Sequence, residues 1–269
     1  MRHPIAAGVG GAGGWQALAW AAELAAHTGE RLVLLQVCAP GSPLDRFAGD
    51  PAPAEVEVVE PALARAYATV GARLGRERTT LKICTGPPSD RLVDASEGVR
   101  LLVIGDGGGG RTIRQVVQRA HCPVVVVHPG NGTAGSLYAG YVVAGVDAST
   151  ASRGALEMAF GYAEQNHLPL AAIHVSERPP GDDAQLLTDA VRPWKRIHPG
   201  VRTRCSVITG SVDDALIRSA AGARLLVVGD KRRGAGDRAR IGDVPLTLAT
   251  AAPCPVAVVP LAQHHTEPL

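Results

Sequence analysis

The chain has 269 residues, which favours two domains at about 100 to 200 residues each. Hydrophobic residues make up 46% and aromatic residues only 3%, so the cores must be built from aliphatic side chains, as in buried parallel strands covered by alanine-rich helices. The formal net charge of +2 is too small for the field that non-specific nucleic-acid binding needs, which excludes nucleic acid as the default partner.

The cysteines and the apolar segments limit the compartment. The five cysteines form no C-x-x-C pair and no histidine-rich metal spacing, and their odd number does not indicate a disulfide framework. The uncharged stretch 5–22 contains five glycines, and no other segment has the roughly 20 apolar residues that spanning a membrane requires. The sequence predicts a soluble cytoplasmic protein without a targeting signal, a membrane segment or a metal site.

A repeat of about half the chain determines its organisation. Three pairs of apolar segments correspond in order: 5–10 and 142–147, 101–106 and 225–230, and 122–127 and 254–259. The first segment of each half leads into an alanine-rich stretch with apolar residues at helical spacing. The two halves are therefore expected to share one fold.

The elements between these segments indicate the fold class. In the first half they predict a second strand at 31–37, a helix at 54–76, a third strand at 81–84 and a short helix after Gly86. In the second half the same elements are predicted at 168–175, 183–195, 201–208 and after Gly210. Five strands with four crossovers predict an α/β protein with two tandem, doubly wound, parallel five-stranded sheets. The glycine-rich stretch 131–140 is predicted to link domain 1–130 to domain 141–262, with 263–269 as a tail.

Ligands of doubly wound sheets bind beyond the carboxyl ends of the strands, where the loops after the first and fourth strands diverge. In the second half the fourth-strand loop, 229–243, is long, glycine-bearing and basic. Its backbone N–H groups, its cations and the helix that follows could hold phosphates. The alternative for this loop is a solvated basic tip.

Four segments of the second half resemble the universal stress protein family in its tandem two-domain form: Gly145–Ser149, Ile173–Val175, Val227–Gly229 and Cys254–Val259. The resemblance covers nearly the whole chain. It implies an adenine nucleotide alpha hydrolase-like fold and a non-enzymatic stress-response or regulatory role. It also implies halves related by a pseudo-two-fold axis, with the final strands 123–128 and 255–260 paired to each other, which would leave no apolar terminal edge open.

Family members that bind ATP carry Gly, two residues, Gly, nine residues, Gly, then Ser or Thr. The loop 229–243 keeps this length, but Arg232 replaces the second Gly and Asp243 replaces Ser or Thr. The Arg232 guanidinium could bind a phosphate oxygen itself. Asp243 remains a good N-cap, but its carboxylate would repel an anion at the same helix end.

The resemblance thus implies a site for ATP or another adenine nucleotide in the second half, with magnesium if the nucleotide is bound. The residues expected there are Asp147, Val175, Gly229, Lys231, Arg232, Gly242 and Asp243. Asp147 would lie near the ribose or adenine, and the backbone of Val175 would contact the adenine. Capping the helix that follows is the alternative role for Asp147.

The first half departs further from the family. Gly10 stands where Asp147 stands in the second half, and the segment from Gly105 to Cys122 is eight residues shorter than its counterpart. The weaker anion-site candidates here are Gly105, Gly108, Gly110 and Arg111.

Two nucleotide motifs compete for the same half. Gly8-x-Gly10-x-x-Gly13 matches a dinucleotide fingerprint, but the second strand ends without an acidic residue for a ribose. Residues 105–112 resemble a Walker A loop with Arg in place of Lys. A glycine-rich turn and a shortened connection, with Thr112 as the helix N-cap, are the favoured interpretations.

Two functions follow from these patterns. The first is a regulatory protein of the universal stress type that binds adenine nucleotide in the second domain. The second is a ligand-free protein-interaction module in which both sites have degenerated and the basic loop contacts an acidic partner. No catalytic residues are predicted, because no base or metal ligands accompany the loops. A slow ATPase activity and a homodimer are left open.

Overall fold

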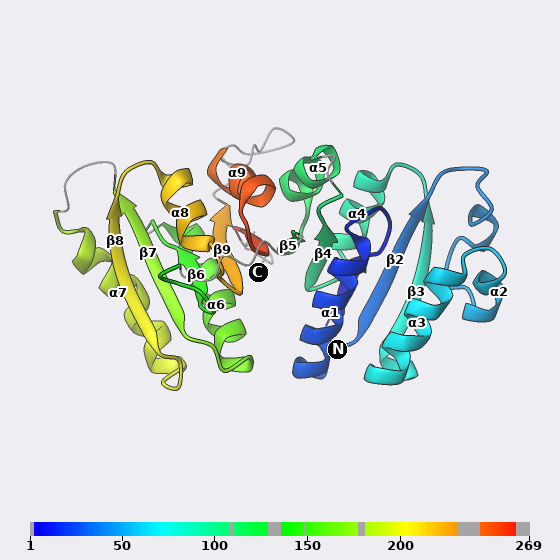
Figure 1. The fold of residues 1–269 in the computed structure, drawn as a ribbon, viewed down its shortest axis with the longest axis horizontal. Coiled ribbons are helices and arrows are strands. Elements are labelled where there is room, and N and C mark those ends of the chain that lie inside the picture. The colour runs from blue at the N-terminus through cyan, green and yellow to red at the C-terminus, as the bar shows by residue number, and fades with distance from the viewer. Residues whose placement is uncertain are drawn as a thin grey trace, which may run out of the picture. The chain divides into compact units, whose positions relative to one another are not determined.

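The chain folds into two compact units, 1–130 (unit 1) and 131–269 (unit 2). The structure is a computed structural model that describes residues 3–107, 110–128, 136–147, 149–176, 181–230 and 243–261. Each unit contains five strands with helices between them (Figure 1).

Unit 1 alternates strands and helices along the chain. Its elements are β1 (Ile5–Gly8), α1 (Gly14–Thr28), β2 (Leu32–Cys38), the 3-10 helix η1 (Asp45–Phe47), α2 (Pro53–Glu57), α3 (Pro61–Leu74), the 3-10 helix η2 (Arg76–Arg78), β3 (Thr79–Thr85), α4 (Pro88–Ser96), β4 (Leu101–Gly105), α5 (Arg111–Arg119) and β5 (Val124–Val127).

Unit 2 repeats this alternation without counterparts of η1, α2 and η2 in its described residues. Its elements are β6 (Val142–Gly145), α6 (Thr150–Gln165), β7 (Leu170–Ser176), α7 (Asp183–Ile197), β8 (Thr203–Thr209), α8 (Val212–Ala220), β9 (Leu225–Asp230), α9 (Asp243–Ala251) and β10 (Val256–Pro260).

The strand order is the same in both units. It runs β3-β2-β1-β4-β5 in unit 1 and β8-β7-β6-β9-β10 in unit 2, with parallel neighbours throughout. The direction of winding therefore reverses between β1 and β4, and between β6 and β9. The doubly wound fold and its two switch points are confirmed.

Helices cover both faces of each sheet. In unit 1, α1 and α3 pack on one face and α4 and α5 on the other; in unit 2, α6 and α7 lie opposite α8 and α9. The first helix of each unit buries alanines against the sheet, and Ala17, Ala21, Ala155 and Ala159 have no exposed surface. Alanine lets these helices approach the strands closely. No helix in the described residues combines the length and apolar character needed to cross a bilayer.

One predicted element is wrong in detail. The single helix expected at 54–76 is two helices, α2 and α3, separated by residues 58–60. Pro61 occupies the first turn of α3. Proline lacks an N–H and clashes with the carbonyl four residues earlier, so it is favoured in the first turn of a helix and disfavoured inside one.

Candidate functional site

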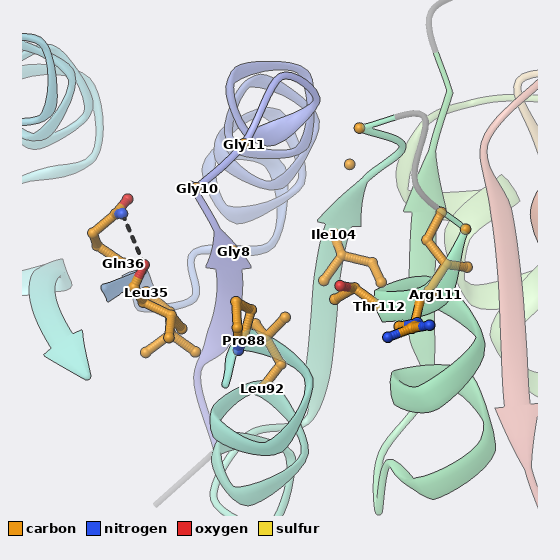
Figure 2. A pocket seen from close by; sticks show the side chains of 15 residues that line it. Gly8, Gly10, Gly11, Leu35, Gln36, Pro88, Leu92, Ile104, Arg111 and Thr112 are labelled. Atoms are coloured by element: carbon orange, nitrogen blue, oxygen red, sulfur yellow. Dashed lines mark hydrogen bonds between the residues drawn. The ribbon is translucent and has the colours of Figure 1, made fainter. Parts of the chain in front are cut away.

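A pocket of about 370 Å³ opens at the switch point of unit 1 (Figure 2). It lies at the carboxyl ends of β1, β2 and β4 and at the N-terminus of α5. Its lining residues are Gly8, Gly10, Gly11, Leu35, Gln36, Val37, Pro88, Leu92, Ile104, Gly105, Gly107, Gly110, Arg111, Thr112 and Ile113. This volume is at the lower end of the range for small-molecule sites. It suits a ligand of mononucleotide size better than a dinucleotide.

The base of the pocket is apolar. Leu35, Leu92, Ile104 and Ile113 are each less than 7% exposed and come from four different elements. The Gln36 amide nitrogen donates a hydrogen bond to the carbonyl of Val37 at 3.1 Å, at the end of β2. A flat ring system with polar edges matches such a surface, because its faces are apolar and its edge atoms can pair with amide and backbone groups.

The opposite wall is positive. Arg111 and Thr112 begin α5, and both are exposed (Figure 2). Gly110 precedes them with φ +55, a left-handed conformation that glycine adopts without strain. Among the described lining residues Arg111 is the only ionisable side chain. A guanidinium beside the unpaired N–H groups of a helix N-terminus attracts an anion.

The structure thus brings three of the four weaker candidates, Gly105, Gly110 and Arg111, to one pocket, while Gly108 lies outside the described residues. Thr112 is in the first turn of α5, and Gly110 is its N-cap, so the assignment of Thr112 as N-cap is wrong. Sequence reasoning also missed the apolar base. Its residues come from four elements that are far apart in the chain, so no local pattern of the sequence points to it.

Packing explains the glycine at the end of the fourth strand. A Cβ on Gly105 would lie 1.9 Å from the carbonyl oxygen of Gly13, and a Cβ on Gly229 would lie 2.4 Å from that of Ala151. The first helix of each unit therefore approaches the strand so closely that only glycine fits. Gly229 was predicted from a ligand loop, yet the helix contact alone requires glycine at this position.

Asp147 lies two residues before Ser149, the N-cap of α6, and is hydrogen-bonded to the start of this helix. Its Oδ1 accepts hydrogen bonds from the Ser149 backbone N–H at 3.0 Å and from the Ser152 hydroxyl at 2.6 Å. The Ser152 hydroxyl also accepts the backbone N–H of Asp147 at 3.0 Å. This closed arrangement satisfies donors at the start of the helix. The ribose role suggested for Asp147 stays a prediction.

The remaining second-half candidates are placed only in part. Val175 is half-buried in β7, and Gly229 is in β9. Asp243 is the first residue of α9, and its side chain lies outside the description. Lys231, Arg232 and Gly242 lie outside the described residues.

The position equivalent to Gln36 differs in unit 2. His174 occupies it, and the Nδ1–H of this histidine donates to the Val146 carbonyl at 2.8 Å. Its Nε2 lies 3.7 Å from Asp183 Oδ1. The His174 side chain is thus hydrogen-bonded to the residue after β6, whereas Gln36 lines a pocket.

Cysteine and metal chemistry find no support in the described residues. Burial raises the pKa of the Cys254 thiol to about 12, which suppresses its nucleophilic thiolate. All five cysteines are free thiols. No three described His, Cys, Asp or Glu side chains come together to hold a metal ion.

Comparison with known proteins identifies relatives for both halves. The sequence profile described as "Universal stress protein family" matches residues 1–128 and 141–260. A universal stress protein of Mycobacterium tuberculosis is 31% identical over 188 residues, covering 62% of this chain and 63% of the relative. The chain therefore spans less than two thirds of that relative's length.

Solved structures share the fold. A universal stress protein from Archaeoglobus fulgidus aligns with a TM-score of 0.70 and 16% identity, over 96% of each chain. A structure from Pseudomonas aeruginosa, titled a putative universal stress protein, aligns with a TM-score of 0.65 and 16% identity, and the alignment covers 96% of this chain and 93% of that one. At such identities these structures support the fold and leave the site chemistry to the residues themselves.

Proposed function

The chain belongs to the universal stress protein family, and we propose that it is a non-enzymatic stress-response or regulatory protein that binds ATP or another adenine nucleotide. The observation that carries this proposal is the pocket at the switch point of unit 1. It combines an apolar base with Arg111 and a helix N-terminus, which suits a ring at one end and a phosphate at the other.

Binding without catalysis is supported by the composition of the lining. The described residues around the pocket include no carboxylate, imidazole or thiol. A general base or nucleophile at hydrogen-bond distance from the ligand is what hydrolysis would need. Magnesium, if present, would accompany the nucleotide phosphates.

The site predicted in unit 2 is part of the same proposal. Its residues Asp147, Val175, Gly229, Lys231, Arg232, Gly242 and Asp243 remain our candidates for a second nucleotide site. Support comes from the strand order, which is the same in the two units and makes the carboxyl ends of β6 and β9 a second switch point. A cytoplasmic location also stays a prediction.

The first measurement is mass spectrometry of small molecules released by denaturing the freshly purified full-length protein. We expect an adenine nucleotide to be released. Isothermal titration with AMP and ATP, with and without magnesium, then gives the affinity. Protein that releases nothing and gives no heat with any of these ligands would contradict the proposal.

Variants assign the binding to a unit. Arg111→Ala should weaken binding about tenfold or more, since a hydrogen bond to a charged group contributes about 1.5 to 3 kcal/mol. Arg114→Ala is the matched control, because Arg114 is an exposed arginine of the same helix that does not line the pocket. Gly10→Leu should block the pocket that Gly10 lines. The atoms nearest to a Cβ at this position belong to the Gln36 side chain, at 3.5 Å or more, so the backbone accommodates leucine and its side chain fills the pocket. Arg232→Ala tests unit 2 in the same way.

A ligand-free interaction module is the second candidate. Arg232, Asp243 and the shortened loop of unit 1 favour it, because each departs from the family's ATP-binding loop. This candidate predicts that replacing Lys231, Arg232 and Arg233 by Ala reduces capture of a protein partner without any change in nucleotide binding.

A further inference from the structure

Strand β8 forms the edge of the unit 2 sheet, and half of its backbone groups face away from the sheet. The backbone carbonyl of Arg202 accepts a hydrogen bond from the N–H of Leu170 at 2.9 Å, and the N–H of Gly210 donates to the carbonyl of Ser176 at 3.0 Å. The backbone groups of the even-numbered residues therefore face β7. Because backbone groups alternate in direction along a strand, the odd-numbered residues of β8 point outward. Such an edge is a template for another strand.

Unit 1 covers the equivalent edge with its own chain. Strand β3 corresponds to β8, with Ile83 at the position of Val207. The N–H of Ile83 donates to Gly49 at 2.8 Å, and its carbonyl accepts from the N–H of Gly49 at 2.9 Å, in an antiparallel bridge. The Tyr67 hydroxyl donates to the carbonyl of Thr79 at 3.2 Å. Three outward backbone groups of β3, those of Ile83 and the carbonyl of Thr79, are thus occupied.

The segment that covers β3 is the β2–α3 connection, residues 39–60. It is acidic, because it carries five carboxylates and one arginine: Asp45, Arg46, Asp50, Glu55, Glu57 and Glu60. It also buries an apolar side chain, since Val56 in α2 has no exposed surface and α2 packs on α3. Unit 1 therefore shows that an acidic segment with a buried apolar side chain can cover such an edge strand.

Unit 2 has no such cover in its described residues. The β7–α7 connection consists of residues 177–182 alone, and no isolated bridge is formed with β8 in the part of unit 2 that is described. The side chains of the two edge strands also differ in exposure. Leu81 of β3 is 3% exposed, whereas its counterpart Cys205 in β8 is exposed.

Exposed cations flank β8 on both faces. Lys195 and Arg196 lie at the end of α7, which packs on β8, and the charge of Lys195 acts on the pKa of Cys205 against the upward effect of burial. Arg204, on the other face, lies 5.9 Å from the ring of Tyr138. Within the described residues Lys195 and Arg196 pair with no carboxylate. In the described part of unit 2, the edge is thus unpaired and flanked by positive charge.

We propose that β8 is a docking site for an acidic segment of a partner protein, which adds to the sheet as an antiparallel strand at Val207. Backbone hydrogen bonds to the odd-numbered residues provide affinity, and the flanking cations select negative charge. The exposed Ile197, at the end of α7, offers an apolar contact like that of Val56 in unit 1. This surface is separate from both switch points.

The test uses a fluorescently labelled peptide with the chain's own residues 44–60 as the acidic probe, titrated with the full-length protein by anisotropy. We expect saturable binding that weakens at high salt. A control peptide with Asn and Gln in place of its Asp and Glu should bind at least about tenfold more weakly. Absence of saturable binding by the acidic peptide overturns the proposal.

Substitutions locate the binding. Val207→Pro removes an outward N–H and leaves the bonds to β7 intact, which edge strands tolerate. It should reduce peptide affinity about tenfold or more, whereas Val207→Thr, which keeps the N–H, should not. If Val207→Pro fails to fold, the charge reversal Lys195→Glu with Arg204→Glu gives the same comparison without a change in the backbone. Peptide binding that is unchanged in these variants overturns the proposal. A concentration-dependent dimer that Val207→Pro abolishes would assign the edge to a second copy of this chain and would also overturn it.

Discussion

The two units share their strand order and the close contact of the first helix with the fourth strand, but they differ at the first-strand loop and at the sheet edge. Gly105 and Gly229 are kept because a helix backbone leaves no space for a side chain. Gly10 and Asp147 occupy equivalent positions with different surroundings: Gly10 lines a pocket, and Asp147 is hydrogen-bonded to the start of α6. The comparison teaches that packing maintains the scaffold of both units, while the first-strand loop and the sheet edge differ between them.

The largest expected effect tests the shared contact. Gly105→Ala would place a methyl group 1.9 Å from the carbonyl oxygen of Gly13, so β4 and α1 must separate. We expect a loss of about 3 kcal/mol or more in the free energy of unfolding, measured by urea denaturation. Gly229→Ala should act in the same direction and less strongly, because its contact is longer, at 2.4 Å.

Gly161→Ala is the control for these substitutions. A Cβ at Gly161, inside α6, meets nothing within 4 Å. Alanine should therefore stabilise the helix by about 0.5 to 1 kcal/mol. Unchanged stability of Gly105→Ala would show that helix and strand do not touch as described.

Much of this scaffold could be predicted from the sequence, because repeated apolar runs report buried strands and the repeat fixes their order. The switch points followed directly from that order. The break before Pro61 was missed, since the apolar spacing continues on both sides of it. The pocket base was missed for a different reason. Leu35, Leu92 and Ile113 are far apart in the chain, and only the folded sheet brings them together.

The second prediction makes unit 1 resemble unit 2 at the first-strand loop. Gly10→Asp introduces a carboxylate into a pocket whose described lining has Arg111 as its only ionisable side chain. The new charge should weaken the attraction of Arg111 for a phosphate, lowering nucleotide affinity about tenfold by isothermal titration. A gain in affinity would instead put the ribose or adenine beside this position, as proposed for Asp147. Gly10→Asn, which has the same shape without the charge, is the control. Equal losses in the two variants would show that steric exclusion, and not charge, governs the pocket.

The third prediction concerns the hydrogen bonds of Asp147 at the start of α6 in unit 2. Asp147→Ala removes the acceptor of two hydrogen bonds at the start of α6 and should cost about 1 kcal/mol of unfolding free energy. Asp189→Ala removes an exposed carboxylate that pairs with Arg192 on α7 and should change stability by less than about 0.5 kcal/mol. If Asp147→Ala is as stable as the parent and loses nucleotide affinity instead, Asp147 is a ligand residue and unit 2 resembles its family more closely than unit 1 does.

The smallest effect concerns the edge that unit 1 covers. The Thr85 hydroxyl, at 2.6 Å, and then the Gly41 N–H, at 2.7 Å, donate to Asp45 and hold the pKa of its carboxyl below its usual range. Because the pKa of Asp45 is lowered in the folded state, its ionised carboxyl contributes its full stabilisation above the unfolded-state pKa of about 4. This stabilisation is lost as the pH falls through the folded-state pKa. Acidification below about pH 4 should therefore loosen the segment that bridges to β3.

Hydrogen exchange measures this loosening at one amide. The Ile83 N–H, bonded to Gly49, should lose protection below about pH 4 relative to the Leu102 N–H, which is bonded inside the sheet to Pro123. Asp45→Asn should remove the pH dependence of this ratio and leave Ile83 less protected at neutral pH. Should the ratio stay constant with pH in the parent protein, Asp45 does not fasten the covering segment. The difference between the two edges would then rest on the Gly49 bridge and on the burial of Val56 alone.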